Sequence, residues 1–493
     1  MRRLLNKLIG EKGAALPITA SMLVVLLGIA GFGTDLGWFY LNASRIQRAA
    51  DAAALAGVIN MPHDFPQAEV DARAAAQTNG YVDGVDDVSI QVAEVPHDPN
   101  QLDVTVTDTV DTFFARIFGM ETVTISRTAR AEFIPPLKLG SPINQFGNSC
   151  DPGTGGSGCG PGFWANIHGK LTDRAMGDAF SPACVGSNDN PGCTGNVFHR
   201  DDGYLYGIDP AGQSSFTIEF LDIAFHNVSN GNPTSDHIRT GDRGCEDWGN
   251  DDAQCGPTMI ISLYGPDPDP LNVSNNPHIC TVEVPPRPQV PEEDPYNWEI
   301  LDSCMQNVSA VPGTYVLQIR IKDEGSAQDR SGLNRYAVRS SPGTKLFALR
   351  DMSIYNNAEV TTEFHLAEVE DYYAGKTLVV ELFDPGEGAQ GYLQMIDPRT
   401  DAPYTGTCRV YDSNNPNSGW NLIGTPTPCQ EHVSVNEYHD RWVKFEMDLP
   451  SDYACGTDCW WMVNYAYGGS IPNDTTTWRA YIVGNPIHLV PHS

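Results

Sequence analysis

The chain has 493 residues, enough for about three domains at roughly 100 to 200 residues each. Its 62 acidic residues outnumber its 30 Lys and Arg, and the formal net charge of -32 excludes a surface that binds nucleic-acid phosphates, so we expect no nucleic-acid partner. Charged residues make up only 19% of the chain, while 47 glycines and 36 prolines favour loop-rich β domains over disorder or helical bundles.

The first structural signal is an uncharged apolar stretch at residues 13–34, GAALPITASMLVVLLGIAGFGT. About 20 apolar residues cross a hydrocarbon core, so residues 13–41 are predicted to form a single transmembrane helix. Four Lys or Arg and one Glu stand within residues 1–12, so we expect this tail in the cytoplasm and the region after Tyr40 exported. The competing hypothesis is a cleaved signal peptide. The length of the apolar stretch and the helical pattern after it favour an anchor.

An Ala-rich run follows directly, LNASRIQRAADAAALAGV at residues 41–58, with Gly57 as a stop, so we expect the helix to continue outward as a rigid stalk. The region as a whole resembles the N-terminal part of the TadE/TadG-like proteins of Tad/Flp pilus assembly, whose hallmark is D-x-G-x-x-Y/F followed by Q-x-A-A-D-A-A-A-L-A-G. The residues that carry this resemblance are Asp35, Gly37, Tyr40, Gln47, Ala49, Ala50, Asp51, Ala52, Ala53, Ala54, Leu55, Ala56 and Gly57.

The resemblance implies a membrane-anchored, non-enzymatic component of a pilus assembly system, whose partners are the lipid bilayer and other membrane subunits of that system. Small side chains in the Ala-rich run would let a partner helix approach closely. Pilin-like members of the family carry a glycine followed five residues later by Glu, where this chain has Ile18 after Gly13 and Ala15 after Gly10. We therefore expect an uncleaved TadG-like anchor. The implied interaction residues are Asp35, Gly37, Tyr40, Gln47, Ala49, Ala50, Asp51, Ala53, Ala54, Leu55 and Gly57.

A compact α+β module is predicted to complete residues 42–134. Its second helix is expected at residues 66–79, PQAEVDARAAAQTN, because a proline stands near its start and Gly80 follows its end. Alternating apolar residues then predict half-buried strands at 88–95, 102–110 and 122–133.

A short segment between the last two of these strands, TFFARIFGM at residues 112–120, has aromatic residues at helical spacing. We predict a short helix that packs across the small sheet. Phe113, Phe114 and Phe118 are then expected in the core, and a partner surface is the alternative.

The remaining chain indicates two mostly-β domains of jelly-roll or sandwich type, at residues 150–343 and 344–493, after a linker at 135–149. Short strand-like runs alternate with turn residues in both. The two domains are predicted to be duplicates, because two pairs of segments align: 203–225 with 362–387, and 314–321 with 459–467.

All twelve cysteines lie between Cys150 and Cys459, in close sequential couples. An even number of cysteines in an exported region favours disulfides formed in an oxidising compartment. The sequence contains no CxxC pair, the pattern typical of a zinc site. Spacing does not determine connectivity. The tentative pairs are Cys150–Cys159, Cys184–Cys193, Cys245–Cys255, Cys280–Cys304, Cys408–Cys429 and Cys455–Cys459.

No catalytic motif is present, so we expect no enzyme, no catalytic residue and no organic cofactor. The glycine run at 151–162 lacks a P-loop lysine, and neither G-x-S-x-G nor H-E-x-x-H occurs. Many TadG proteins carry a D-x-S-x-S metal site, but the nearest string here ends in Tyr355. Structural calcium stays open beside a solvated acidic surface, with these candidate ligands: Asp201, Asp202, Asp236, Asp242, Asp247, Asp251, Asp252, Asp267 and Asp269.

Two other functions compete with pilus assembly. One is a surface adhesin or carbohydrate-binding protein that uses a Tad-like anchor; the other is a calcium-dependent hydrolase. Carbohydrate binding would use exposed aromatic rings, although we expect most of the tryptophans to fill the sandwich cores. The candidates are Trp164, Trp248, Trp420, Trp460, Trp461 and Trp478.

Overall fold

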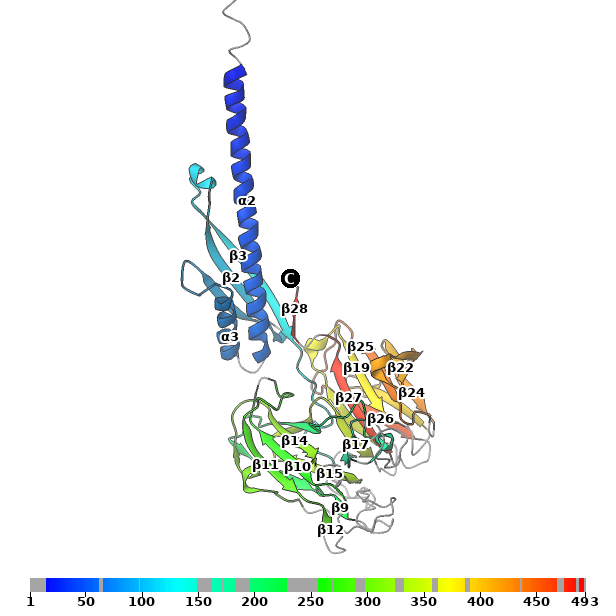
Figure 1. Cartoon of the computed structure of the whole chain (residues 1–493). Helices are drawn as coiled ribbons and strands as arrows, with labels where there is room; N and C mark the ends of the chain where they lie inside the picture. The colour runs from blue at the N-terminus through cyan, green and yellow to red at the C-terminus, as the bar shows by residue number, and fades with distance from the viewer. Residues whose placement is uncertain are drawn as a thin grey trace, which may run out of the picture. The chain divides into compact units, whose positions relative to one another are not determined.

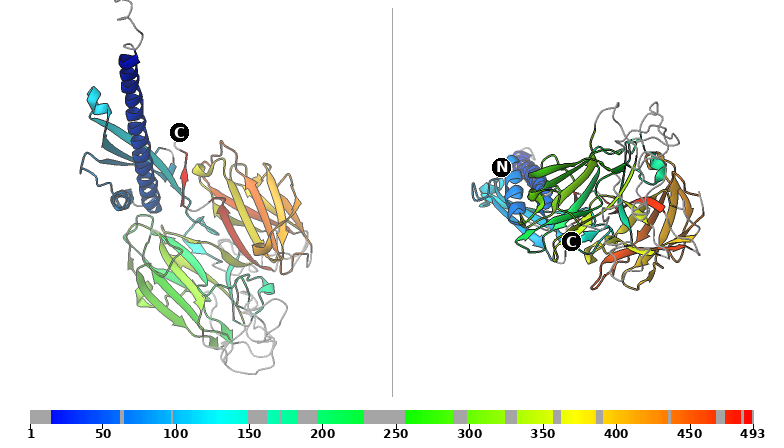
Figure 2. Two further views of the ribbon diagram at one scale, coloured as in Figure 1. Left: turned by 45° about the horizontal axis from the view of Figure 1, so that its top comes forward. Right: turned by 90° about the horizontal axis from the view of Figure 1, so that it is seen from below.

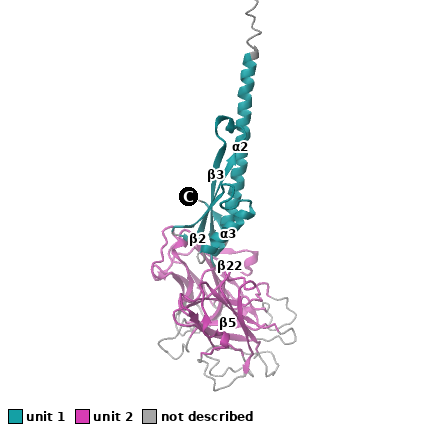
Figure 3. Ribbon diagram, turned by 90° about the vertical axis from the view of Figure 1, so that its left-hand side faces the viewer, with its two compact units in different colours: residues 1–135, 485–493 teal, residues 136–484 magenta. Residues whose placement is uncertain are grey.

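A computed structural model describes the chain (Figure 1) at residues 15–61, 65–96, 98–148, 162–170, 172–182, 196–227, 256–267, 269–288, 298–323, 332–356, 362–385, 391–434, 437–467, 474–484 and 487–491. It divides into two compact units (Figure 3). Unit 1 comprises Met1–Pro135 and Asn485–Ser493, and unit 2 comprises Pro136–Gly484. The predicted class, a long N-terminal apolar helix, a small α+β module and mostly-β domains, is confirmed.

Within the described residues, unit 1 contains two α-helices and one antiparallel sheet. The helix α2 (Ala15–Gly57) runs without a break from the apolar stretch through the Ala-rich run, and the one-turn η1 (Val58–Asn60) follows it. The second helix is α3 (Phe65–Thr78), ended by Gly80 at φ +91°. The sheet has the order β1-β2-β3-β28, with these bounds: β1 (Ser89–Val95), β2 (Asp98–Asp111), β3 (Thr122–Phe133) and β28 (Ile487–Val490).

The core of unit 1 lies between the helices and one face of this sheet. Alternation along β2 places Leu102, Val104 and Val106 inside, while the opposite face carries polar pairs such as Thr105 and Thr128, whose hydroxyls lie 2.8 Å apart. From the helices, the core takes small side chains that let α2 and α3 approach closely. Those that are fully buried are Ala49, Ala50, Ala53 and Ala54 of α2, and Ala68, Ala72 and Ala76 of α3.

The final strand of the chain belongs to unit 1. β28 pairs antiparallel with β3, with Ile487 opposite Phe133 and Val490 opposite Arg130, and the red strand near the mark C in Figure 2 is β28. We predicted that the second β domain extends to residue 493. Instead, β28 belongs to unit 1. Along the sequence, the whole of unit 2 lies between β3 and β28, which are neighbouring strands in the unit 1 sheet.

In its described segments, unit 2 is built around one large sheet and two five-stranded sheets. The first five-stranded sheet has the order β11 (His278–Val284), β10 (Met259–Tyr264), β14 (Tyr315–Ile321), β6 (Tyr204–Asp209) and β16 (Lys345–Ala348). The second has β18 (Thr362–Glu368), β26 (Trp460–Tyr467), β20 (Gly391–Asp397) and β21 (Ala402–Pro403), and β24 (Gln430–Val433) pairs with β20.

The large sheet has ten strands, in the order β23 (Asn421–Gly424), β22 (Cys408–Ser413), β25 (Trp442–Asp448), β19 (Thr377–Phe383), β27 (Asp474–Ile482), β17 (Met352–Asn356), β5 (Trp164–His168), β15 (Leu333–Ser340) and β4 (Gln145–Phe146), with β8 (Ile218–Leu221) paired to β15. Two short pairs complete unit 2: β9 (His226–Asn227) with β12 (Arg287–Pro288), and β7 (Ser215–Phe216) with β13 (Val308–Ser309). The single-turn helices are η4 (Arg174–Met176), η5 (Ser303–Met305), η6 (Asp371–Tyr373) and η7 (Pro416–Ser418).

The duplicated segments predicted from the sequence occupy matching places in unit 2. β6 pairs with β14 as β18 pairs with β26, and β8 pairs with β15 as β19 pairs with β27. The two copies meet where β5 pairs antiparallel with β17, with Ala165 opposite Ile354. A single sheet therefore continues from one copy into the other.

The predicted domain boundaries differ from this arrangement. β16 begins just after the predicted boundary at 343/344, yet it pairs with β6 of the first copy. The predicted linker also packs into unit 2, because Leu137 and Leu139 are almost fully buried and Leu139 bridges to Ala348 and Ala367. The contacts therefore divide the chain near residues 135 and 484.

Candidate functional site

The N-terminal part of α2 exposes a continuous apolar surface. Val24 is 68% exposed, and other apolar side chains from Ile18 to Phe32 are at least half exposed. In the part of the chain that the structure describes, α2 is the one helix long and apolar enough to cross a membrane. The predicted anchor is therefore present as a helix that unit 1 leaves uncovered along most of its apolar length.

Asp35, the first residue of the motif, is buried at the junction between this apolar segment and the β2–β3 hairpin. Its carboxylate accepts backbone N–H bonds from Phe113 at 2.9 Å, Phe114 at 3.0 Å and Ala115 at 2.7 Å. These amides open η2 (Ala115–Phe118), a single turn that we call, with its flanks at residues 112–121, the hairpin tip. Charged acceptors form the stronger class of hydrogen bond, so Asp35 ties the tip to α2.

The contacts around Asp35 are aromatic. The ring centroids of Trp38 and Phe113 lie 5.4 Å apart, and those of Phe32 and Phe118 lie 6.3 Å apart. A Cβ atom on Gly31 would come within 2.9 Å of the Phe114 ring, so a glycine at this position lets the ring lie against the helix backbone. Sequence reasoning missed both Gly31 and the contact that it allows.

The predicted location of the short helix was wrong. We expected it to pack across the sheet with its phenylalanines in the core, but Phe113 is 51% exposed and Phe118 is 70% exposed. The reason is the length of the hairpin: the pairing of β2 with β3 continues to Asp111 opposite Thr122, so the turn that joins them emerges beside α2 (Figure 1). Aromatic spacing alone could not distinguish a buried helix from an exposed tip.

The second part of the motif binds α2 to the rest of unit 1. The Gln47 side-chain amide donates to Asp51 Oδ1 at 2.8 Å and to the Thr128 carbonyl of β3 at 3.3 Å. Leu55 packs half-buried against the core. A Cβ atom on Gly57 would come within 2.7 Å of the Ala68 carbonyl oxygen and of Leu102, so this glycine permits the close approach of α3.

The remaining motif positions separate into buried and exposed. Ala49, Ala50, Ala53 and Ala54 are fully buried in the unit 1 core, so this run faces the chain's own helix and sheet rather than a partner helix. A Cβ atom on Gly37 would meet no neighbour within 4 Å, and Tyr40 is 78% exposed. Of the interaction residues expected from the sequence, these two lie on the free side of α2.

Replacing Asp35 with Ala is expected to release the hairpin tip from α2, because three backbone N–H groups lose their charged acceptor. With charged hydrogen bonds worth roughly 1.5 to 3 kcal/mol each, we expect amide exchange at Phe113, Phe114 and Ala115 to rise about a hundredfold by hydrogen–deuterium exchange. Asp35→Asn keeps one acceptor oxygen and should give a smaller rise. Asp111→Asn changes an exposed carboxylate of the same hairpin and is the control. Unchanged exchange in Asp35→Ala would contradict this role.

Three of the expected disulfides are present: Cys280–Cys304, Cys408–Cys429 and Cys455–Cys459. The other three pairs, Cys150–Cys159, Cys184–Cys193 and Cys245–Cys255, lie outside the described residues. Disulfides persist in oxidising compartments, so the three bonds favour export of unit 2.

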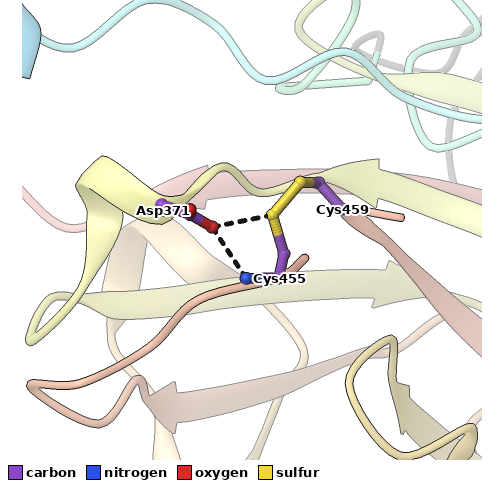
Figure 4. A group of neighbouring side chains, drawn as sticks. All are labelled: Asp371, Cys455 and Cys459. Carbon is purple, nitrogen blue, oxygen red and sulfur yellow. Dashed lines mark hydrogen bonds between the residues drawn. A yellow bond between two sulfur atoms is a disulfide. The ribbon is translucent and has the colours of Figure 1, made fainter. Parts of the chain in front are cut away.

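One cluster in the described part of the chain has residue types that could bind a metal ion: Asp371, Cys455 and Cys459 (Figure 4). The Asp371 carboxylate accepts the Cys455 N–H at 2.7 Å and contacts its Sγ at 3.0 Å. Because the two sulfur atoms are bonded to each other, neither is a thiolate, the form that binds metals. The geometry indicates a disulfide held against η6.

The acidic residues considered for calcium are not brought together where they are described. Asp202 pairs with Arg350, Asp201 with His199, and Asp267 accepts the backbone N–H of Asp269. The others, Asp236, Asp242, Asp247, Asp251 and Asp252, lie outside the described residues. Asp351, in the string that lacks the metal-binding serine, pairs with Arg350.

The tryptophans considered for carbohydrate binding mostly fill the core of unit 2, as we expected. Trp164, Trp461 and Trp478 are fully buried and Trp460 is nearly so. Trp420 is half-buried beneath the Lys444 ammonium, and Trp248 lies outside the described residues.

Unit 2 also contains a cavity of about 250 Å³ that sequence reasoning did not identify. Its lining includes His168, Asp178 and Tyr204; the Tyr204 hydroxyl donates to Asp178, and burial raises the pKa of that carboxyl. Burial lowers the pKa of His168 to about 3, so the imidazole is neutral at ordinary pH. The lining also includes Ser181, but its hydroxyl donates to the Thr172 carbonyl at 3.3 Å. Neither ring nitrogen of His168 has a hydrogen-bond partner among the described residues, so the cavity holds no nucleophile paired with this histidine and its geometry does not favour the hydrolase hypothesis.

Comparison with known proteins agrees with the motif. Residues 13–77 match a family model described as putative Flp pilus-assembly TadE/G-like. The match covers α2 and most of α3, the elements that contain or contact the motif residues. No curated protein and no solved structure matches the chain.

Proposed function

We propose that this chain is a membrane-anchored, non-enzymatic component of a Tad/Flp-type pilus assembly system. The observation that carries the proposal is the family match at residues 13–77, whose motif residues join an apolar helix to a folded module. α2 would serve both as the membrane anchor and as part of the core of unit 1. One continuous helix would therefore connect the membrane to unit 1 and fix the position of unit 1 at the membrane surface. Unit 2 would be the exported interaction region.

Charge and redox chemistry support the proposed orientation, with the N-terminus in the cytoplasm and unit 2 exported. The basic residues within 1–12 favour a cytoplasmic N-terminus, and the disulfides of unit 2 favour an oxidising compartment on the other side. The same acidic, disulfide-linked exterior is expected to function without an organic cofactor. Structural calcium, bound by its acidic residues, would stabilise this exterior further.

The surface that we propose for other membrane subunits is the exposed side of α2 at Leu36, Gly37 and Tyr40. Leu36 is 63% exposed, and the lack of a side chain at Gly37 would let a second helix approach the backbone. This surface replaces the Ala-rich run as the partner contact, because that run is occupied by α3 and the sheet.

The test combines deletion of the gene in its native host with two matched variants. Gly37→Leu adds a side chain to the proposed partner surface. Gly28→Leu adds the same side chain nine residues earlier, which at 3.6 residues per turn lies on the opposite side of α2, and neither glycine has a neighbour within 4 Å to clash. Surface pili are counted by electron microscopy, and the amount of membrane-bound chain is measured by immunoblot.

We expect deletion to abolish pili, Gly37→Leu to reduce them strongly at a normal protein level, and Gly28→Leu to leave them unchanged. Normal pili after deletion would overturn the assembly role. If adhesion to a matrix is lost in that case, the adhesin hypothesis replaces it, with unit 2 carrying the function and α2 acting only as an anchor.

A further inference from the structure

We propose that the hairpin tip, residues 112–121, inserts into the outer leaflet of the membrane that α2 crosses, as a second attachment of unit 1 to the lipid. The tip presents five apolar side chains to the exterior. Their exposed fractions are 51% for Phe113, 43% for Phe114, 75% for Ile117, 70% for Phe118 and 49% for Met120. An exposed apolar cluster of this density marks a site of protein or membrane interaction.

The position of the tip along α2 favours lipid as the occupant. Asp35 binds the backbone of the tip, and the Phe118 ring lies beside Phe32 of α2. Phe32 is about one helical turn closer to the N-terminus of α2 than Asp35 is. The uncharged stretch at residues 13–34 is about 33 Å long as a helix, close to the roughly 30 Å thickness of a hydrocarbon core. Phe32 therefore lies at the end of the hydrocarbon region, and the tip lies at the same depth.

The hydrogen bonding of the tip is suited to an environment with little water. Asp35 accepts the N–H groups of residues 113–115, and the Thr112 N–H donates to the Glu121 carbonyl. Within the turn, Ile117 donates to Phe114, Gly119 to Arg116 and Met120 to Ala115. Backbone polar groups at membrane depth must be paired within the protein, so a tip whose amides are paired in this way can enter the lipid at low cost.

The charged residues around the tip lie where they can reach water or the lipid headgroups while the apolar side chains enter the membrane. Asp111 and Glu121 stand at its two ends and mark the level at which the hairpin returns to water. Arg116 is the charged side chain between them; its Nε donates to the Thr112 carbonyl, and the rest of its exposed guanidinium can reach lipid phosphates. The apolar surface of the tip is continuous with that of α2 at Phe32, so a single lipid boundary covers both.

This inference rests on α2 spanning the membrane, as proposed above. The experiment uses the full chain, reconstituted in phosphatidylcholine–phosphatidylglycerol nanodiscs that contain a lipid with a photoactivatable diazirine on its acyl chain. After irradiation, labelled peptides are located by mass spectrometry. We expect labels in α2 between residues 18 and 32 and also in residues 113–120.

The matched variants are Ile117→Asp with Phe118→Asp, at exposed positions of the tip, and Val70→Asp, at a 57% exposed position on α3. The tip variant should lose labelling at residues 113–120 and keep it in α2, whereas Val70→Asp should keep both. Labelled α2 without labelled tip overturns insertion while leaving the anchor intact. Absence of label from α2 overturns the anchor and the insertion together.

Discussion

Replacing Trp442 with Ala is expected to lower the free energy of unfolding of unit 2 by about 4 kcal/mol, the upper range for removing a buried aromatic side chain. Trp442 is fully buried at the end of β25. Its ring centroid lies 6.1 Å from that of Phe180, 5.9 Å from that of Phe198 and 5.2 Å from that of Phe383. Two of these rings come from the first copy of the duplicated fold and one from the second.

Because the ring joins the two copies, we expect both to lose stability together in Trp442→Ala. The measurement is hydrogen–deuterium exchange of the full chain in increasing denaturant, followed in β6 of the first copy and β19 of the second. Trp420→Ala, which removes a half-buried indole just before β23, is the control and should cost less than about 1 kcal/mol. A loss of protection confined to β19 and its neighbours would mean that the copies unfold as two independent domains.

Replacing Ala53 with Trp is expected to destabilise unit 1 by about 3 kcal/mol or more. Ala53 is fully buried, in the α2 face packed with α3 and the sheet, and an indole there must displace neighbouring side chains or separate the elements. Amide exchange in α3 and β2 should rise. Exchange in unit 2 should not change, because its core does not include Ala53.

Ala74→Trp provides the control for Ala53→Trp, since it makes the same chemical change at an exposed position of α3. Its effect on unit 1 stability should be within about 0.5 kcal/mol. If Ala53→Trp left unit 1 intact but removed partner subunits from crosslinked complexes, the Ala-rich run would be an intermolecular contact after all.

Local patterns in the sequence were sufficient to predict the two helices and the first three strands of unit 1. The uncharged stretch and the Ala-rich run predict one long helix, and alternation at 88–95 and 122–133 predicts strands, because each signal depends on residues close in the chain. The duplicated segments were also found, since similar sequences adopt similar strand pairs.

Contacts between distant residues could not be predicted in the same way. Asp35 binds amides at residues 113–115, and nothing in the sequence near either segment indicates that the β2–β3 hairpin is long enough to reach that level of α2. Likewise, β5 and β17 each have the pattern of a buried strand, but that pattern does not specify which strand lies beside which. The Ala-rich run is buried because α3 packs against it. Small side chains permit this packing, but they do not specify which helix packs there.

The return of β28 to the unit 1 sheet has a consequence for biogenesis. The ribosome makes β3 before residues 136–484 and β28 after them, so the edge of β3 that β28 occupies stays unpaired until the whole of residues 136–484 has been synthesised and, if exported, translocated. A truncated product would keep an open strand edge next to the anchor, where proteases and chaperones act on incomplete chains. Closure of the four-stranded sheet therefore requires that synthesis has passed residue 484 and reached β28.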